Sequence, residues 1–187
     1  MPDEQRYREV ERRLWKSVRL EPVERRIRVA GVGVRVQLVE DGPPVVFLHG
    51  GPNSGSTWAP LLPHLTKFRC YVVDRPGTGL SDDFVLLDDL HGFARRFVSQ
   101  VLGRAGSLRG FPPELTIPND VLRSVRAPTL FLWGEDDPFG AAAVASRVVE
   151  LMPHASLRMI AAAGHLPWLD DPDTIGRATA EFLSATD

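Results

Sequence analysis

The sequence contains little cysteine and no long apolar run. Cys70 is its single cysteine, so no disulfide can form within the chain and a disulfide-stabilised scaffold is excluded. No apolar stretch approaches the roughly 20 residues that a membrane-spanning helix needs. The polar N-terminus, MPDEQRYREV, also lacks the apolar core of a secretion signal. These absences predict a cytoplasmic protein that does not associate with a membrane.

The sequence also lacks a large excess of either charge. Its formal net charge is −2, and the arginines between Arg6 and Arg28 alternate with glutamates, as they do on a solvated helix face. This balance gives no electrostatic reason to expect nucleic acid as a partner. Hydrophobic residues make up 43% of the 187 residues, which is enough for one globular domain with its own core.

Apolar residues recur at helical spacing in four segments of the chain. These segments are residues 7–18, 90–102, 142–151 and 175–183. A further helix is expected where Trp58, Leu61, Leu62 and Leu65 follow an apolar run.

Strand patterns of two kinds alternate with these helices. Alternating residues between Ile27 and Leu38 predict two strands that each bury one face. Continuous apolar runs at residues 45–48, 70–73 and 129–133 are typical of strands buried on both faces of a parallel sheet. A last strand is expected around residues 157–160. The order of elements predicts an α/β three-layer sandwich with a mainly parallel sheet.

Two glycines follow directly after the first continuous apolar run, in VVFLHGGPNSGSTW. Because Gly50 and Gly51 have no side chains, backbone N–H groups there can approach a developing oxyanion closely, as acyl transfer requires. The alternative is a tight turn that needs glycine for its backbone conformation. The Gly-Lys-Ser/Thr element of a phosphate-binding loop is absent.

An aspartate and a histidine lie at the ends of two further predicted strands. Asp137 lies in TLFLWGEDDPFG, three residues after Gly134, and His165 lies in AAAGHLPWLDDP. Either residue alone is more often structural than catalytic. Together they occur in the chain order that the last two members of the α/β-hydrolase triad use, each at the carboxyl end of its own strand.

These motifs, together with DRPGTGLSD at residues 74–82, make the chain resemble the α/β-hydrolase fold superfamily, over about residues 21–83 and 126–183. It is most similar to single-domain hydrolases with an HGGP oxyanion segment and a helical cap. The resemblance implies a small-molecule substrate or ligand and no cofactor or metal. It also implies roles for individual residues. These are Gly51 as oxyanion donor, Gly50 as a turn residue, Asp137 as triad acid (or Asp136, if the loop register differs by one) and His165 as general base.

The family's nucleophile motif, G-x-S-x-G, is absent from this sequence. No serine, no aspartate and no cysteine has glycine at both two-residue offsets. Ser107 in AGSLR has Ala105 before it and Arg109 after it. Only 44 residues separate Asp83 from Pro128. The family places the nucleophile strand, a helix, another strand and the cap in this interval, and one βαβ unit alone takes about 30 residues. Residues 84–127 are therefore expected to be a shortened region within a single domain, 1–187.

Two expectations about function and structure follow. The chain is expected to be an impaired hydrolase; the alternatives are a binding module, or an enzyme in which His165 and Asp137 activate water directly. In either kind of enzyme the two side chains should be hydrogen-bonded, at about 2.6–3.2 Å. We also expect the strands at 45–48 and 129–132 to pair directly and in parallel, which gives a six-stranded sheet, because free apolar edges promote aggregation. The helix at 90–102 would then make a right-handed crossover.

Overall fold

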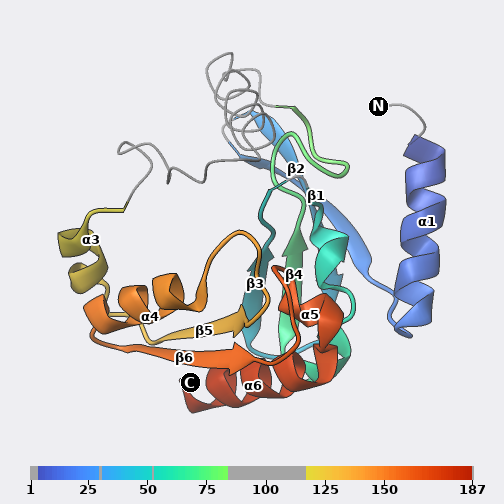
Figure 1. The fold of residues 1–187 in the computed structure, drawn as a ribbon. Helices are drawn as coiled ribbons and strands as arrows, with labels where there is room; N and C mark the ends of the chain where they lie inside the picture. The colour runs from blue at the N-terminus through green and yellow to red at the C-terminus, as the bar shows by residue number, and fades with distance from the viewer. Residues whose placement is uncertain (1–3, 30, 52, 84–116, 187) are drawn as a thin grey trace.

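The computed structural model describes residues 4–29, 31–51, 53–83 and 117–186 (Figure 1). The N-terminal elements are α1 (Glu4–Ser17), β1 (Val23–Val29), β2 (Val32–Val39), β3 (Pro44–Leu48), the 3₁₀ segments η1 (Gly55–Trp58) and η2 (Leu62–His64), and β4 (Arg69–Val73). The C-terminal elements are α3 (Asn119–Ser124), β5 (Thr129–Gly134), α4 (Ala142–Leu151), β6 (Ala155–Ile160), α5 (Pro167–Asp170) and α6 (Pro172–Ala185).

Three of the expected helices are present as α1, α4 and α6. Helix α6 begins with a proline at its first position, and the Asp171 side chain caps it by accepting a hydrogen bond from the Thr174 N–H at 3.0 Å. The helix expected at 90–102 lies outside the described residues. The helix expected around Trp58 is wrong, because that segment forms η1 and η2 instead. Pro60 and Pro63 lack the N–H groups that a continuous helix needs there.

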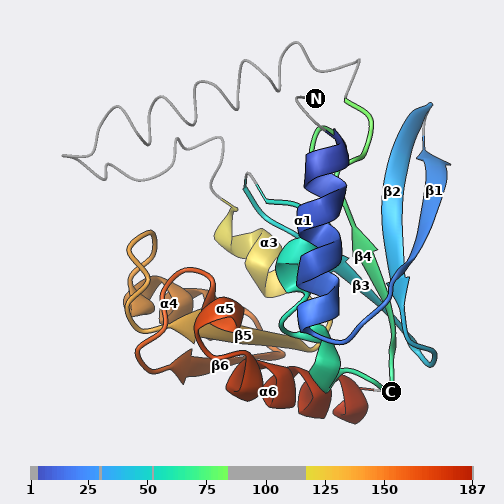
Figure 2. The ribbon, with the colours of Figure 1, turned by 90° about the vertical axis from the view of Figure 1, so that its right-hand side faces the viewer.

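The first sheet has four strands in the order β1-β2-β4-β3. The β1–β2 and β2–β4 pairs are antiparallel, and β3 lies parallel to β4 with Val45 opposite Cys70. A second sheet consists of β5 and β6 in parallel, with Thr129 opposite Ala155. Helix α1 lies on one side of the first sheet, and α6 runs next to β6 (Figure 2). The fold belongs to the α/β class, as the sequence predicts.

The expected direct pairing of β3 with β5 is wrong, because these strands belong to two separate sheets. In Figure 1, β5 and β6 lie crosswise to β3 and β4. The expectation that β3 is buried on both faces is also wrong. Phe47 is 7% exposed, but Val46 and Leu48 are 60% and 61% exposed. Strand β5 is half-buried along most of its length. Both strands therefore have the apolar sequence that is typical of interior strands, but neither is fully buried.

The core lies where the two sheets meet through helices rather than through paired strands. Ile175 of α6 belongs to the same buried cluster as Leu62 of η2 and Leu65, which follows η2. Trp58 and Trp168 pack on this cluster from the two halves of the described chain. The β5–β6 unit is thus attached to the first sheet from one side, through α5 and α6.

Candidate active site

The loop after β3 contains the predicted oxyanion glycines. His49 is 3% exposed, whereas Gly50 and Gly51 are exposed. Gly51 has a φ of +29°, a backbone conformation that side chains disfavour. A Cβ built at either Gly50 or Gly51 would meet nothing within 4 Å. The structure therefore places both glycines at the carboxyl end of β3, with open space in front of them.

The loop after β4 holds the glycine loop in place. The Arg75 N–H donates to His49 Nε2 at 3.1 Å, so that nitrogen is an acceptor and the proton of the neutral ring resides on Nδ1. His49 Nδ1 then donates to Gly50 O at 3.0 Å. The Arg75 side chain also donates to Gly51 O at 3.1 Å. Both glycine carbonyls are thus fixed, and the peptide between them has a defined orientation.

Asp74 links this loop to the interior of the first sheet. Its carboxylate accepts hydrogen bonds from the Gly55 N–H at 2.7 Å, the Leu80 N–H at 3.0 Å and Arg35 Nη1 at 3.0 Å. Asp74 is 1% exposed and Arg35 is 2% exposed. The carboxylate therefore ties together the loops that follow β3 and β4, on either side of the glycine turn.

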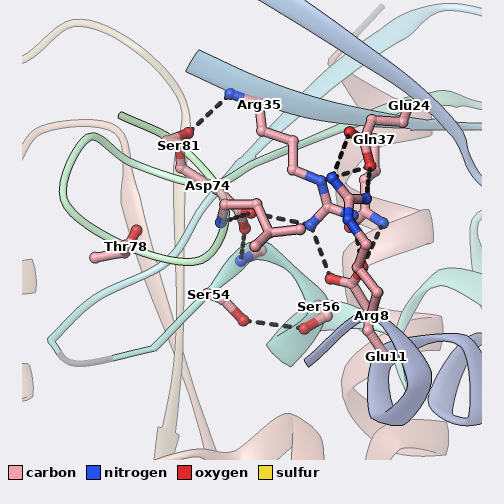
Figure 3. Close-up of polar contacts among 12 residues, drawn as sticks. Arg8, Glu11, Glu24, Arg35, Gln37, Ser54, Ser56, Asp74, Thr78 and Ser81 are labelled. Atoms are coloured by element: carbon pink, nitrogen blue, oxygen red, sulfur yellow. Dashed lines mark hydrogen bonds and ion pairs between the residues drawn. The ribbon is translucent and has the colours of Figure 1, made fainter. Parts of the chain in front are cut away.

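The Arg35 guanidinium is surrounded by carboxylates (Figure 3). Besides Asp74, it donates to Glu11 of α1 at 2.9 Å and to Glu24 of β1 at 2.9 Å. Burial alone would lower the pKa of Arg35, but the Glu11 and Asp74 carboxylates raise it above its ordinary value. A permanently charged group at the centre of this network anchors α1 to the sheet. Sequence reasoning did not identify this network.

Asp137 and His165 form the hydrogen bond that the sequence predicts. Asp137 Oδ2 lies 3.0 Å from His165 Nδ1. The Asp137 side chain is 5% exposed and that of His165 is 53% exposed. The Phe139 ring contacts the imidazole edge-on, with ring centroids 4.9 Å apart. Asp136 is exposed, and its N–H bonds to Ala163 O. The loop register is therefore the one that presents Asp137 to the histidine.

The acid is held in its ionised form by its partners. Burial alone would raise the pKa of Asp137, but the hydrogen bonds from His165 and from the Phe139 N–H outweigh this and lower it. The Phe139 N–H donates to Asp137 Oδ1 at 2.8 Å. Each carboxylate oxygen thus has a partner, and the aspartate orients the imidazole so that its Nε2 faces away from the pair.

Gly134 allows the loops that carry the two residues to meet. A Cβ at Gly134 would lie 2.1 Å from Gly164 O and 2.2 Å from Ala163 O. Only glycine permits this close approach of the end of β5 to the loop after β6. The Gly164 N–H also donates to Asp170 at 2.8 Å, which fixes the backbone next to His165.

No described residue occupies the place of a nucleophile next to His165. Within the described ranges, the imidazole of His165 is hydrogen-bonded to Asp137. The hydroxyls of Ser54 and Ser56 are hydrogen-bonded to each other at 3.0 Å. Burial raises the pKa of Cys70 to about 11, so this thiol is not a nucleophile at neutral pH. Ser107 lies outside the described residues.

Within the described ranges, no group of three or more His, Cys, Asp and Glu side chains is placed so that it could hold a metal ion. None of the helices described there is both long enough and apolar enough to span a membrane.

Known proteins similar to this chain include hydrolases. Residues 43–91 match the family described as alpha/beta hydrolase fold. A 2-hydroxy-6-oxononadienedioate/2-hydroxy-6-oxononatrienedioate hydrolase of Burkholderia vietnamiensis is 32% identical over 93 residues, 46% of this chain and 32% of that protein. The protein of the same name from Cupriavidus pinatubonensis is 30% identical over 155 residues, 74% of this chain. This chain therefore spans about a third and about half (32% and 53%) of the lengths of these two relatives.

A solved structure shares the fold over nearly the whole chain. Carboxylesterase CesB of Bacillus subtilis superposes with a TM-score of 0.76 at 16% identity, over 98% of this chain and 99% of that one. The chain has the α/β-hydrolase fold, and residues 43–91 match the model of that family. Its sequence lacks the nucleophile motif G-x-S-x-G.

Proposed function

We propose that this chain derives from a hydrolase of ester or amide-type bonds, and that it retains the acid–base pair of that chemistry without its nucleophile. The hydrogen bond between Asp137 and His165, at 3.0 Å, carries the proposal. A buried carboxylate bonded to Nδ1 fixes the tautomer in which Nε2 can accept a proton. That is the role of a general base in acyl transfer.

In this proposal Gly51 supplies one backbone donor to the oxyanion. The second donor in this family is the N–H of the residue after the nucleophile, so it is missing together with the nucleophile. Removing the nucleophile from a comparable triad lowers turnover by about 10⁶. The residual catalysis, about 10³–10⁴ over water, depends on an intact oxyanion hole. The isolated chain should therefore be strongly impaired or inactive.

Hydrolysis of p-nitrophenyl acetate tests this proposal directly. The purified chain, His165→Ala and Asp137→Asn are compared under identical conditions, by following the release of p-nitrophenol. We expect no burst and the same rate for all three proteins. A burst of p-nitrophenol equal to the enzyme concentration would demonstrate a covalent intermediate, and the proposal would then be wrong.

A second candidate function is hydrolysis by water that the pair activates. The observation in its favour is that the His165 side chain is 53% exposed, so water can reach Nε2. This function predicts steady release of p-nitrophenol without a burst, at a rate that His165→Ala and Asp137→Asn both reduce. Equal rates for the three proteins would exclude it.

A further inference from the structure

A groove of about 420 Å³ lies between β3 and β5, where the two sheets face each other. Its walls come from both strands, and its floor from η1, α5, α6 and the segment between η1 and η2. The lining residues on the strands are Val46, Phe47, Leu48, Leu130 and Leu132. Those of the floor are Trp58, Leu61, Pro167, Trp168, Ile175 and Thr179.

Both strands along this groove have a free edge in the described part of the chain. Strand β3 pairs with β4 on one side only, and β5 pairs with β6 on one side only. The main-chain N–H and C=O groups on a free edge can be satisfied in a regular way by another strand. The groove therefore offers main-chain pairing to an extended polypeptide.

The side chains that line the groove determine the chemistry of its occupant. They include no charged group, and Thr179 is the one lining residue with a hydroxyl. Val46 and Leu48 are 60% and 61% exposed, although they belong to an apolar run. Burying apolar surface of this kind is favourable, whereas burying an unpaired charge there is not. The complementary occupant is apolar and uncharged.

The floor of the groove keeps its walls apart. Trp168 stacks on Trp58 with ring centroids 4.2 Å apart, and its Nε1–H donates to Thr57 O at 2.9 Å. Direct pairing of β3 with β5 would have to displace this packed floor.

We propose that this groove is a docking site for an extended, uncharged, apolar segment of another polypeptide, which pairs as a strand with the free edge of β3. The inference concerns an interaction surface, and it holds whether or not Asp137 and His165 are catalytically active.

Binding of a defined peptide tests the proposal on the full chain. The probe is a fluorescein-labelled peptide of five alternating Val and Leu residues with two lysines at each end for solubility. Its control has proline in place of the central valine, which removes an N–H donor and prevents regular pairing. Fluorescence anisotropy should show saturable binding of the first peptide and much weaker binding of the second.

Two variants locate the binding site. Leu48→Lys places a charge on the wall of the groove, and we expect it to weaken binding about tenfold or more, because the ammonium group would be buried without a partner. Val144→Lys is the matched control, since Val144 is 53% exposed on α4 and does not line the groove. It should leave the affinity unchanged.

Three outcomes would overturn the proposal. Equal binding of both peptides would show general apolar adsorption rather than strand pairing. Absence of binding would show that the groove does not accept an extended apolar strand. A dimer in sedimentation velocity that Leu48→Lys converts to monomer would show that a second copy occupies the groove.

Discussion

Trp168 stacks on Trp58 with ring centroids 4.2 Å apart and an interplanar angle of 29°. Its indole also donates a hydrogen bond to Thr57 O, 111 residues earlier in the chain. In one continuous sheet, main-chain hydrogen bonds between strands would join the N-terminal and C-terminal halves of the protein. In this structure, the contact between the Trp58 and Trp168 rings is one of the principal links between the two halves.

Trp168→Ala should therefore destabilise the protein by about 2–3 kcal/mol, somewhat less than for a fully buried tryptophan because Trp168 is half-buried. Trp168→Phe keeps one ring against Trp58 but loses the hydrogen bond and part of the ring surface, so it should cost less than the alanine substitution, about 1–2 kcal/mol. Urea unfolding followed by far-UV circular dichroism measures both. Equal stabilities of the alanine variant and the wild type would show that the stack does not join the halves.

The buried charges around Arg35 give a second prediction. Arg35→Met leaves the Glu11 and Asp74 carboxylates buried without their partner, which should destabilise the protein by about 3–5 kcal/mol. The control is Arg147→Ala, because the Arg147–Glu150 pair is exposed on α4 and should contribute less than about 0.5 kcal/mol. Thermal unfolding of the two variants provides the comparison. A loss of similar size in both would contradict the buried network.

The close approach at Gly134 predicts a large effect of one methyl group. Gly134→Ala would place a Cβ about where Gly164 O and Ala163 O now lie, so the backbone must move. Such overpacking typically costs about 1–3 kcal/mol. Gly50→Ala is the matched control, since a Cβ there meets nothing within 4 Å. Denaturant unfolding should show a loss in the first variant only, and equal losses would contradict the observed contact.

The lowered pKa of Asp137 predicts a stability difference that depends on pH. A carboxyl whose pKa is lower in the folded state stabilises the fold above its unfolded pKa, about 3.9, and this contribution is lost as pH falls through the folded pKa. Asp137→Asn should therefore be about 1 kcal/mol less stable than the wild type at pH 7. The difference should shrink below about pH 4. Urea unfolding between pH 3 and pH 7 tests this, and a constant difference would contradict it.

Local patterns in the sequence predicted several elements and one contact correctly. The apolar spacing predicted α4 at residues 142–151, where the structure has it. Asp137 and His165 were expected to meet because each follows a parallel strand, and strands β5 and β6 do lie in parallel. These features depend on short stretches of chain, so the sequence contains the information for them.

Features that depend on distant neighbours were not predictable in the same way. The run at 45–48 has the composition of an interior strand, but its exposure depends on which strand lies beside it. Arg35 alternates with Val34 and Val36, a pattern that predicts an exposed arginine. Arg35 is nevertheless buried, because α1 covers its face of the strand with Glu11. The paired charges are recognisable only once α1 and β2 are placed together.

The central claim, that this chain has the acid–base pair of a hydrolase and no nucleophile, is tested most directly with a serine-directed fluorophosphonate probe. The purified chain is incubated with the probe, and intact-mass spectrometry measures the fraction modified, with a serine esterase as positive control. We predict no stoichiometric labelling, because no serine in the sequence lies in a G-x-S-x-G motif and none in the described part of the chain is bonded to His165. Stoichiometric modification of any serine, Ser54 and Ser107 included, that His165→Ala abolishes would contradict the claim.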